Sequence, residues 1–162
     1  MRFFLVSALL LCTTALAADP GTPAGWRSAR FGMTPDEVLA AFPGEAVRIS
    51  PEVKLADGNT IPVGIDGYAF EGLSFDVRFV FEGGRLVLVS LRTPAKKPVD
   101  AESYVRLRDA LVKSWGEPLE DAKDDAFIDM RQTRWNRGAG RADLKYIPGV
   151  VAIVHYPRPA AQ

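Results

Sequence analysis

The stretch from Ser74 to Arg92 constrains the fold more than any other part of the chain. Residues 74–82 alternate apolar and polar side chains, residues 85–92 form a second β-rich run, and Gly83-Gly84 separates the two. Successive side chains of a strand point to opposite faces, and a two-residue glycine turn suits a tight hairpin. The stretch therefore predicts an antiparallel hairpin whose apolar face consists of Phe75, Val77, Phe79 and Phe81.

Two helices are predicted, one on each side of this hairpin in the sequence. Thr34 and Glu37 form a capping box around Pro35, and Pro43-Gly44 ends this helix after about three turns. The second helix is expected to begin after Asp100 and to end at Gly116. Its apolar residues recur at helical spacing and are Tyr104, Leu107, Leu111, Val112 and Trp115.

Further strands are expected around these elements. Tyr68–Phe70 predicts a short strand before the hairpin, after a polar passage at 45–67 that is rich in turn signals. Behind the second helix, an acidic linker leads into three predicted strands, at 127–136, 141–147 and 150–156.

The order of these elements predicts an α+β, two-layer fold. We expect an antiparallel sheet of about six strands, covered on one face by the two helices. Each half has the order helix, linker and strands, which indicates an internal duplication of a helix-plus-three-strands unit. Repeat one is expected at about 26–93 and repeat two at about 99–157.

The N-terminus predicts a secretory signal peptide at residues 1–17. Met1-Arg2 is positively charged, residues 3–12 are an apolar run broken by Ser7, and Ala15-Leu16-Ala17 fits a small-x-small cleavage site. The apolar run is shorter than the roughly 20 residues that cross a bilayer as a helix, so we expect no membrane-spanning segment. The expected product is a single domain at residues 18–162 in the periplasm.

The position of the cysteine and the net charge indicate whether a lipid anchor or a nucleic-acid partner is expected. The one cysteine of the chain, Cys12, follows Leu11, whereas lipoprotein processing requires a small residue at that position, so we expect no lipidation. The 20 Lys and Arg residues balance the 20 Asp and Glu residues, which provides no overall attraction to nucleic acid. We therefore expect no nucleic-acid partner.

The first predicted helix also carries a resemblance to known envelope proteins. The run from Phe31-Gly32-Met33-Thr34 to Val38, followed by Ala41-Phe42-Pro43-Gly44, resembles the "G-M-T-x-x-x-V … F-G" signature of the small lipoprotein of the outer-membrane β-barrel assembly machinery (SmpA/OmlA type). The doubled helix-plus-strands layout is similar to that of the tandem-repeat β-lactamase inhibitor protein. The chain lacks the lipidated cysteine of the first and the disulfide cysteines of the second. The resemblance implies a non-catalytic scaffold that is used for protein contacts.

Few residue sets in the sequence could supply chemistry. The single histidine, His155, lies in an apolar strand pattern, no G-x-S-x-G elbow occurs, and no thiol remains after the predicted cleavage. One histidine without thiols does not make a usual zinc set, so we expect no metal and no cofactor. The acidic residues between 117 and 129 are interpreted as a solvated linker. A small hydrolase with paired carboxylates stays open as an alternative, as does a carrier of a lipid-like ligand in an apolar cavity.

One constellation carries a binding hypothesis. Arginines recur at 131, 134, 137 and 141, and on a strand Arg131 and Trp135 share one face while Arg134 points to the other. Arginine and tryptophan are enriched at interface hot spots, and guanidinium groups suit carboxylate or phosphate. The candidate binding residues are Arg131, Arg134, Trp135 and Arg137. The alternative is cross-strand pairing with the acidic linker. The sequence therefore predicts a periplasmic, non-catalytic protein that contacts another envelope protein.

Overall fold

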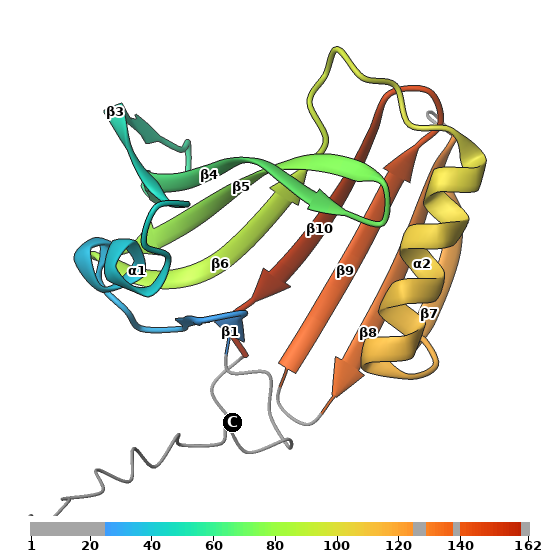
Figure 1. Ribbon diagram of the computed structural model, residues 1–162. Coiled ribbons are helices and arrows are strands. Elements are labelled where there is room, and N and C mark those ends of the chain that lie inside the picture. Colours follow the sequence, from blue (N-terminus) through green and yellow to red (C-terminus); the bar gives the residue numbers. More distant parts are fainter. Residues whose placement is uncertain (1–24, 125–128, 138–139, 160–162) are drawn as a thin grey trace, which may run out of the picture.

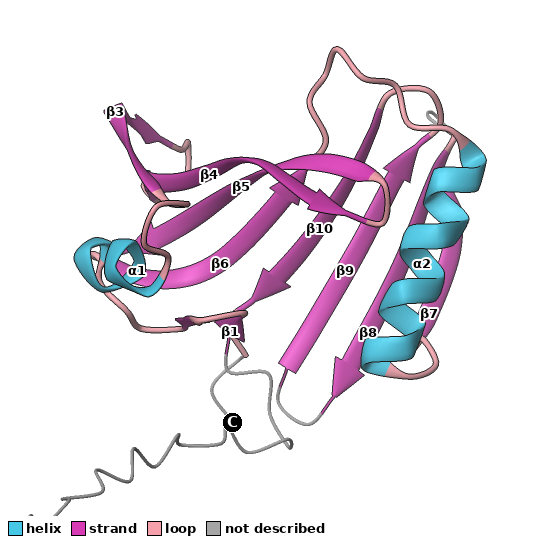
Figure 2. Ribbon diagram, in the orientation of Figure 1, coloured by secondary structure: helices cyan, strands magenta, loops and turns pink. Residues whose placement is uncertain are grey.

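The computed structural model describes residues 25–124, 129–137 and 140–159, so the predicted signal peptide lies outside the described residues. Within these ranges the chain forms two helices and ten strands (Figures 1 and 2). In chain order they are β1 (Gly25–Trp26), β2 (Ala29–Arg30), α1 (Pro35–Ala41), β3 (Val47–Lys54), β4 (Thr60–Phe70), β5 (Leu73–Glu82), β6 (Arg85–Arg92), α2 (Ala101–Trp115), β7 (Glu120–Asp124), β8 (Met130–Arg137), β9 (Gly140–Ile147) and β10 (Val151–Pro157).

The predicted α+β class is wrong, because the described chain is mainly β, with 53% strand and 17% helix. Eight strands form one antiparallel sheet in the order β3-β4-β5-β6-β10-β9-β8-β7, and β1 pairs with β2 in a separate ribbon. The expected sheet had about six strands. The difference arises at the two edges of the sheet, where the sequence was interpreted as loop.

Both edge strands lack the apolar alternation that marks a strand. β3 and most of β4 fall in the passage at 45–67, and seven of the eight residues of β3 are exposed. Pro51 interrupts the pairing of β3 with β4, where the register shifts between Arg48 and Val53. The expected acidic linker contains β7, which pairs with β8 through its backbone. Charged residues and proline are typical of edge strands, because they discourage pairing with other chains.

The local predictions at the hairpin and at both helix starts are confirmed. Glu82 pairs with Arg85 across Gly83-Gly84, whose φ angles of 55° and 75° suit a tight turn. Thr34 and Glu37 make the expected capping box, although α1 has only seven residues. Asp100 caps α2, because its carboxylate accepts a 2.7 Å hydrogen bond from the Ser103 backbone N–H.

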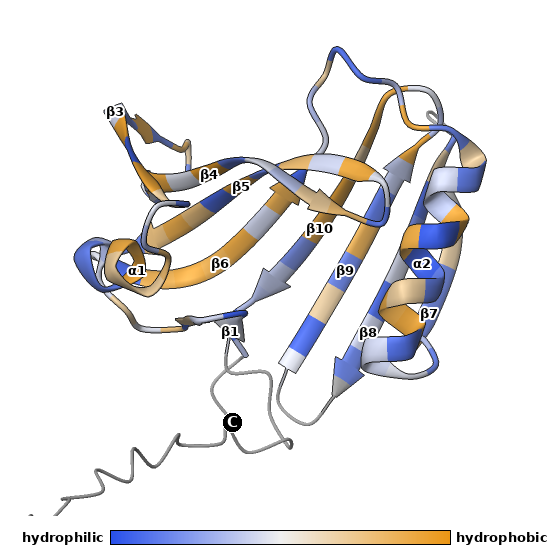
Figure 3. Ribbon diagram, in the orientation of Figure 1, coloured by the Kyte–Doolittle hydropathy of each residue, from blue (hydrophilic) through white to orange (hydrophobic). Residues whose placement is uncertain are grey.

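One face of the large sheet forms the core, together with both helices. Val77, Leu91, Val154 and Leu144 lie in one cross-strand row through β5, β6, β10 and β9, and all are buried. Side chains from both helices pack on this same face, namely Val38, Phe42, Leu107 and Leu111. Figure 3 shows apolar residues concentrated on β5 and β6, near α1, whereas α2 lies over the other half of the sheet by β8. The sheet therefore buries one face and leaves the other without a covering helix among the described residues.

The far end of the β4–β5 hairpin reaches over this core. Figure 1 shows the hairpin arching across β10 toward α2. Phe70 at its tip lines a common pocket with Leu111 and Trp115 of α2, which places the tip beside the helix. Neither described helix is long and apolar enough to cross a membrane.

Candidate functional site

The structure separates the four arginine and tryptophan residues that the sequence grouped. Arg131 and Trp135 lie on the face of β8 that packs under α2, whereas Arg134 lies on the opposite face. The backbone of Arg137 pairs with Gly140 at the end of β8, and its side chain lies outside the described part. The four residues therefore do not form one surface around the turn.

Arg134 is held by carboxylates on both neighbouring strands. Its Nε donates to Asp143 Oδ1 at 2.9 Å, and its Nη1 donates to Glu120 Oε2 at 2.7 Å. Arg141 also pairs with Asp143, at 2.8 Å. The hydrogen bond that Arg134 donates to the Asp143 carboxylate raises the pKa of Arg134. The charge of Arg134 is thus compensated by cross-strand pairs, which matches the alternative interpretation of this cluster.

Trp135 belongs to the core. Its side chain is fully buried, and its indole Nε1–H has no hydrogen-bond partner in the described structure. Ala142 lies directly opposite on β9. A residue without exposed surface does not contact a partner protein, so Trp135 acts through packing.

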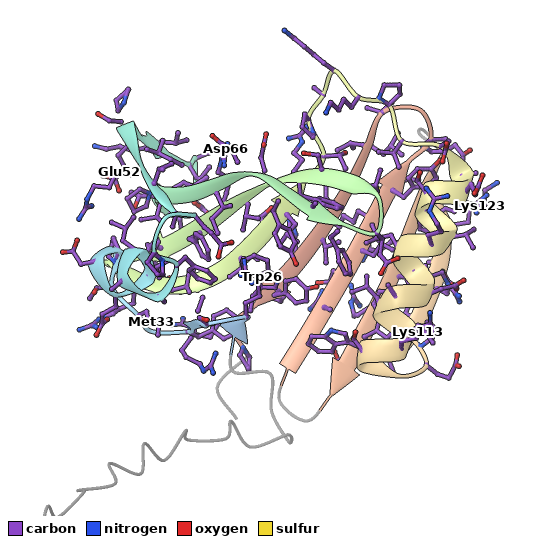
Figure 4. The ribbon with its side chains drawn as sticks, viewed as in Figure 1. Trp26, Met33, Glu52, Asp66, Lys113 and Lys123 are labelled. Carbon is purple, nitrogen blue, oxygen red and sulfur yellow. The ribbon has the colours of Figure 1, made fainter. Side chains whose placement is uncertain are left out.

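Arg131 lines a cleft between α2 and strands β7 and β8, which we call the α2–β8 cleft. The cleft has a volume of ≈ 390 Å³ and is lined by Tyr104, Val105, Arg108, Asp121, Ala122, Lys123 and Arg131. Helical spacing places Tyr104 and Arg108 on one side of α2, and the register Lys123↔Arg131 brings β7 and β8 together opposite them. Figure 4 shows Lys123 near the N-terminal end of α2.

Asp121 is the fixed anionic group of the α2–β8 cleft. Arg108 Nε and Nη2 donate to Asp121 Oδ2 at 3.2 and 2.9 Å. Thr133 Oγ1 donates to Asp121 Oδ1 at 3.0 Å and lies 3.1 Å from the Tyr104 hydroxyl, which donates to it. The hydrogen bonding of Arg108 to the Asp121 carboxylate raises the pKa of Arg108. Asp121 and Arg108 therefore neutralise each other in one network.

Arg131 is left without such a partner. Its guanidinium carbon lies 5.5 Å from the centroid of the Tyr104 ring, a distance typical of a cation–π contact. Its Nε is buried and has no hydrogen-bond acceptor in the described structure. Tyr104 in turn stacks on Tyr146, with ring centroids 4.6 Å apart. The tyrosine pair thus holds a guanidinium at the cleft without neutralising its charge.

Sequence reasoning named Arg131 but missed the other polar residues of the α2–β8 cleft. Tyr104 is predicted only as one of the apolar residues of the second helix, and Asp121 and Lys123 lie within the expected linker. Residues 120–124 (EDAKD) show no apolar alternation, so the sequence carries no local signal for a strand there. Only the pairing of β7 with β8 shows that these residues face α2.

The single histidine lies on the opposite, uncovered face of the sheet. His155 on β10 pairs with Ser90 on β6 and with Asp143 on β9, so the three residues follow one another across the strands. Burial lowers the pKa of His155, assisted by the nearby charge of Lys145 and opposed by that of Asp143. The carboxylate of Asp143 accepts from Arg134 and Arg141, so it does not orient the imidazole as a catalytic triad requires.

Metal ligands do not gather in the described part of the chain. No group of three or more His, Cys, Asp and Glu residues there could hold a metal ion. Among the described residues that line the α2–β8 cleft, Asp121 is the one carboxylate. The arrangement suits the binding of an anion more than glycosidase-type chemistry, which uses a pair of carboxylates.

The fold and the cleft define a mainly β protein with one large antiparallel sheet and a cationic cleft at one of its helices. No protein-family model matches this chain, and no curated protein or solved structure matches it.

Proposed function

We propose that this protein is a periplasmic, non-catalytic binding protein whose α2–β8 cleft receives an acidic side chain of another envelope protein. The observation that carries the proposal is the guanidinium of Arg131, which lines the cleft without a carboxylate partner among the described residues. Charged groups that leave water are normally paired, so a partly buried, unpaired guanidinium favours an incoming anion.

The charge of the cleft supports the same occupant. Arg108 and Lys123 line it together with Arg131, but Arg108 pairs with Asp121 and Lys123 lies 3.9 Å from Asp129, so the charge of Arg131 is the one that an incoming carboxylate would meet. A guanidinium presents its donors in a planar fork that fits a carboxylate with two parallel hydrogen bonds. The volume of ≈ 390 Å³ leaves room for one acidic side chain and its backbone.

The predicted leader and the resemblance at residues 31–44 support an envelope location for this partner.

The two alternative functions have less support. A glycosidase-type hydrolase uses two carboxylates at one site, and the described lining of the cleft contributes Asp121. A lipid carrier needs a cavity larger than the ≈ 150 Å³ aromatic pocket beside α2.

The proposal can be tested with a defined acidic probe. We would titrate acetyl-tetraglutamate amide into the protein, follow the Arg131 Nε–H signal by NMR, and measure the affinity by calorimetry. We expect the signal to shift and the substitution Arg131→Met to weaken binding roughly tenfold, which corresponds to the loss of one charge-assisted contact. Acetyl-tetraglutamine amide should not bind.

Arg106→Met is the matched control. Arg106 is exposed on α2, pairs with Glu102 at 2.7 Å and does not line the cleft, so this variant should retain the affinity of the unmodified protein. In cells, a photoreactive residue at Ala122 should give a protein adduct that Arg131→Met removes and Arg106→Met does not. Equal loss of binding in both variants, or equal affinity for the glutamate and glutamine peptides, would overturn the proposal.

A further inference from the structure

A second pocket lies beside the other half of α2, which we call the aromatic pocket. It is lined by Trp26, Tyr68, Phe70, Leu91, Leu111, Ser114, Trp115 and Tyr156. These residues come from β1, β4, β6, β10 and α2, so the pocket exists only because the β4–β5 hairpin reaches the helix. Figure 4 places Trp26 near the middle of the molecule, below that hairpin.

The pocket has the size of one aromatic ring. Its volume is ≈ 150 Å³, and an apolar cavity of roughly 150 Å³ is known to hold benzene. Pockets for drug-sized ligands begin at about 300 Å³, so a longer apolar chain does not fit. Leu91 and Leu111 are buried, whereas Tyr68, Phe70 and Trp115 are partly exposed at the walls.

The aromatic walls present both ring faces and ring edges. Trp115 stacks with Tyr156 at 5.9 Å, and Tyr68 stacks with Phe70 at 6.4 Å between ring centroids. Trp26 meets the Tyr68 ring edge-on at 5.1 Å. Aromatic rings pair favourably in offset-stacked and edge-to-face geometry, so one more ring completes the cluster.

The guanidinium of Arg27, which lies next to the pocket, disfavours a cationic ligand. The guanidinium carbon of Arg27 lies 5.3 Å from the Trp26 ring and 5.5 Å from the Tyr68 ring, so these two walls already bind a cation. Glu45 fixes Arg27 there through two hydrogen bonds of 2.8 and 3.0 Å. Arg27 therefore already takes the cation–π contact that a second cation would need on these rings, whereas a neutral ring does not need it.

We infer that the aromatic pocket is a binding site for one neutral aromatic ring. The ring can belong to a free small molecule or to a phenylalanine side chain of a protein, since the pocket chemistry is the same for both. This inference does not depend on the α2–β8 cleft, which is lined by other residues of α2.

The test uses three probes on the full protein. Toluene represents a free ring, acetyl-phenylalanine amide represents a ring borne on a peptide, and choline represents a cation. We expect toluene to shift the indole N–H signals of Trp26 and Trp115 and to show nuclear Overhauser contacts with Tyr156. If acetyl-phenylalanine amide shifts the same signals, the source includes protein side chains; if only toluene does so, the ligand is a free molecule. Either result supports the ring site.

A pocket-filling variant provides the control. Ser114→Leu adds a side chain into the pocket and should abolish the shifts, whereas Lys113→Leu adds the same side chain on α2 outside the lining and should preserve them. The contacts in the unmodified protein decide the question even if Ser114→Leu folds poorly. Absence of toluene contacts with Tyr156, or equal shifts with choline, would overturn the inference.

Discussion

Arg134 on β8 and Asp143 on β9 lie directly opposite each other, and Arg134 Nε donates a 2.9 Å hydrogen bond to Asp143 Oδ1. Asp143 keeps only 8% of its side chain exposed and also pairs with Arg141. The pair joins the strand that carries the α2–β8 cleft to the middle of the sheet. Arg134, which the sequence predicts as a binding residue, thus also links two strands of the sheet.

We expect Asp143→Asn to lower the free energy of unfolding more than Asp66→Asn does. Asp66 pairs with Arg78 at 2.8 Å but keeps 69% of its side chain exposed, and such exposed pairs contribute about 0–1 kcal/mol. Asp143 is nearly buried between two guanidinium groups, so its neutralisation removes the charged acceptor of Arg141 and leaves Arg134 with Glu120 alone. Urea unfolding of the two variants measures the difference, and equal losses would contradict this role for Asp143.

We expect Glu71→Asn to stabilise the protein by roughly 0.5–1 kcal/mol, because the native glutamate is strained. Glu71 and Gly72 connect β4 and β5 with φ angles of 49° and 74°, and a left-handed φ is unfavourable for glutamate but tolerated by asparagine. Thermal unfolding measures the gain. Gly72→Ala, which introduces strain at the neighbouring position, should shift the transition in the opposite direction.

The cap of α2 predicts a pH dependence of stability. The hydrogen bond from the Ser103 backbone N–H lowers the pKa of Asp100 from the ordinary value of 3.8. The hydrogen bond with the Ser103 side chain has a smaller effect in the same direction. Because the folded state holds the lower pKa, ionised Asp100 stabilises the fold above about pH 4, and this contribution is lost as the pH falls through the lowered pKa. Asp100→Asn keeps a capping oxygen but does not titrate. Urea midpoints between pH 2 and 6 should therefore fall less steeply in Asp100→Asn than in the unmodified protein.

His155 predicts a second pH dependence of stability, and here too the stability falls as the pH falls. Burial, together with Lys145, lowers the pKa of His155 below 6.5, although Asp143 opposes the shift. The unfolded chain then binds the proton more readily, so stability is complete above pH 6.5 and declines as the pH falls toward the lowered pKa. His155 is the single histidine of the chain, so its NMR signal reports the pKa directly. A measured pKa above 6.5 would contradict the burial argument.

Elements with strong local signals were predictable from the sequence. The Gly83-Gly84 hairpin follows from alternation and a two-residue glycine turn, and Thr34 and Asp100 mark helix starts through hydrogen bonds with residues three positions away. These features depend on neighbours in the chain. The local patterns therefore determined the strand pair and both helix starts before any tertiary contact was considered.

Only the tertiary structure decided the class of the fold and the sites. β3 and β7 bear the polar side chains of loops and become strands because β4 and β8 offer backbone hydrogen bonds at the sheet edges. The same pairing carries Lys123 beside Arg131, and the reach of Phe70 to α2 closes the aromatic pocket. These contacts join residues that are distant in the sequence, or that lie in a segment predicted as a linker. No local sequence pattern could therefore determine them. The amino-acid sequence determined the periodic elements, and long-range pairing decided which charges and rings face one another.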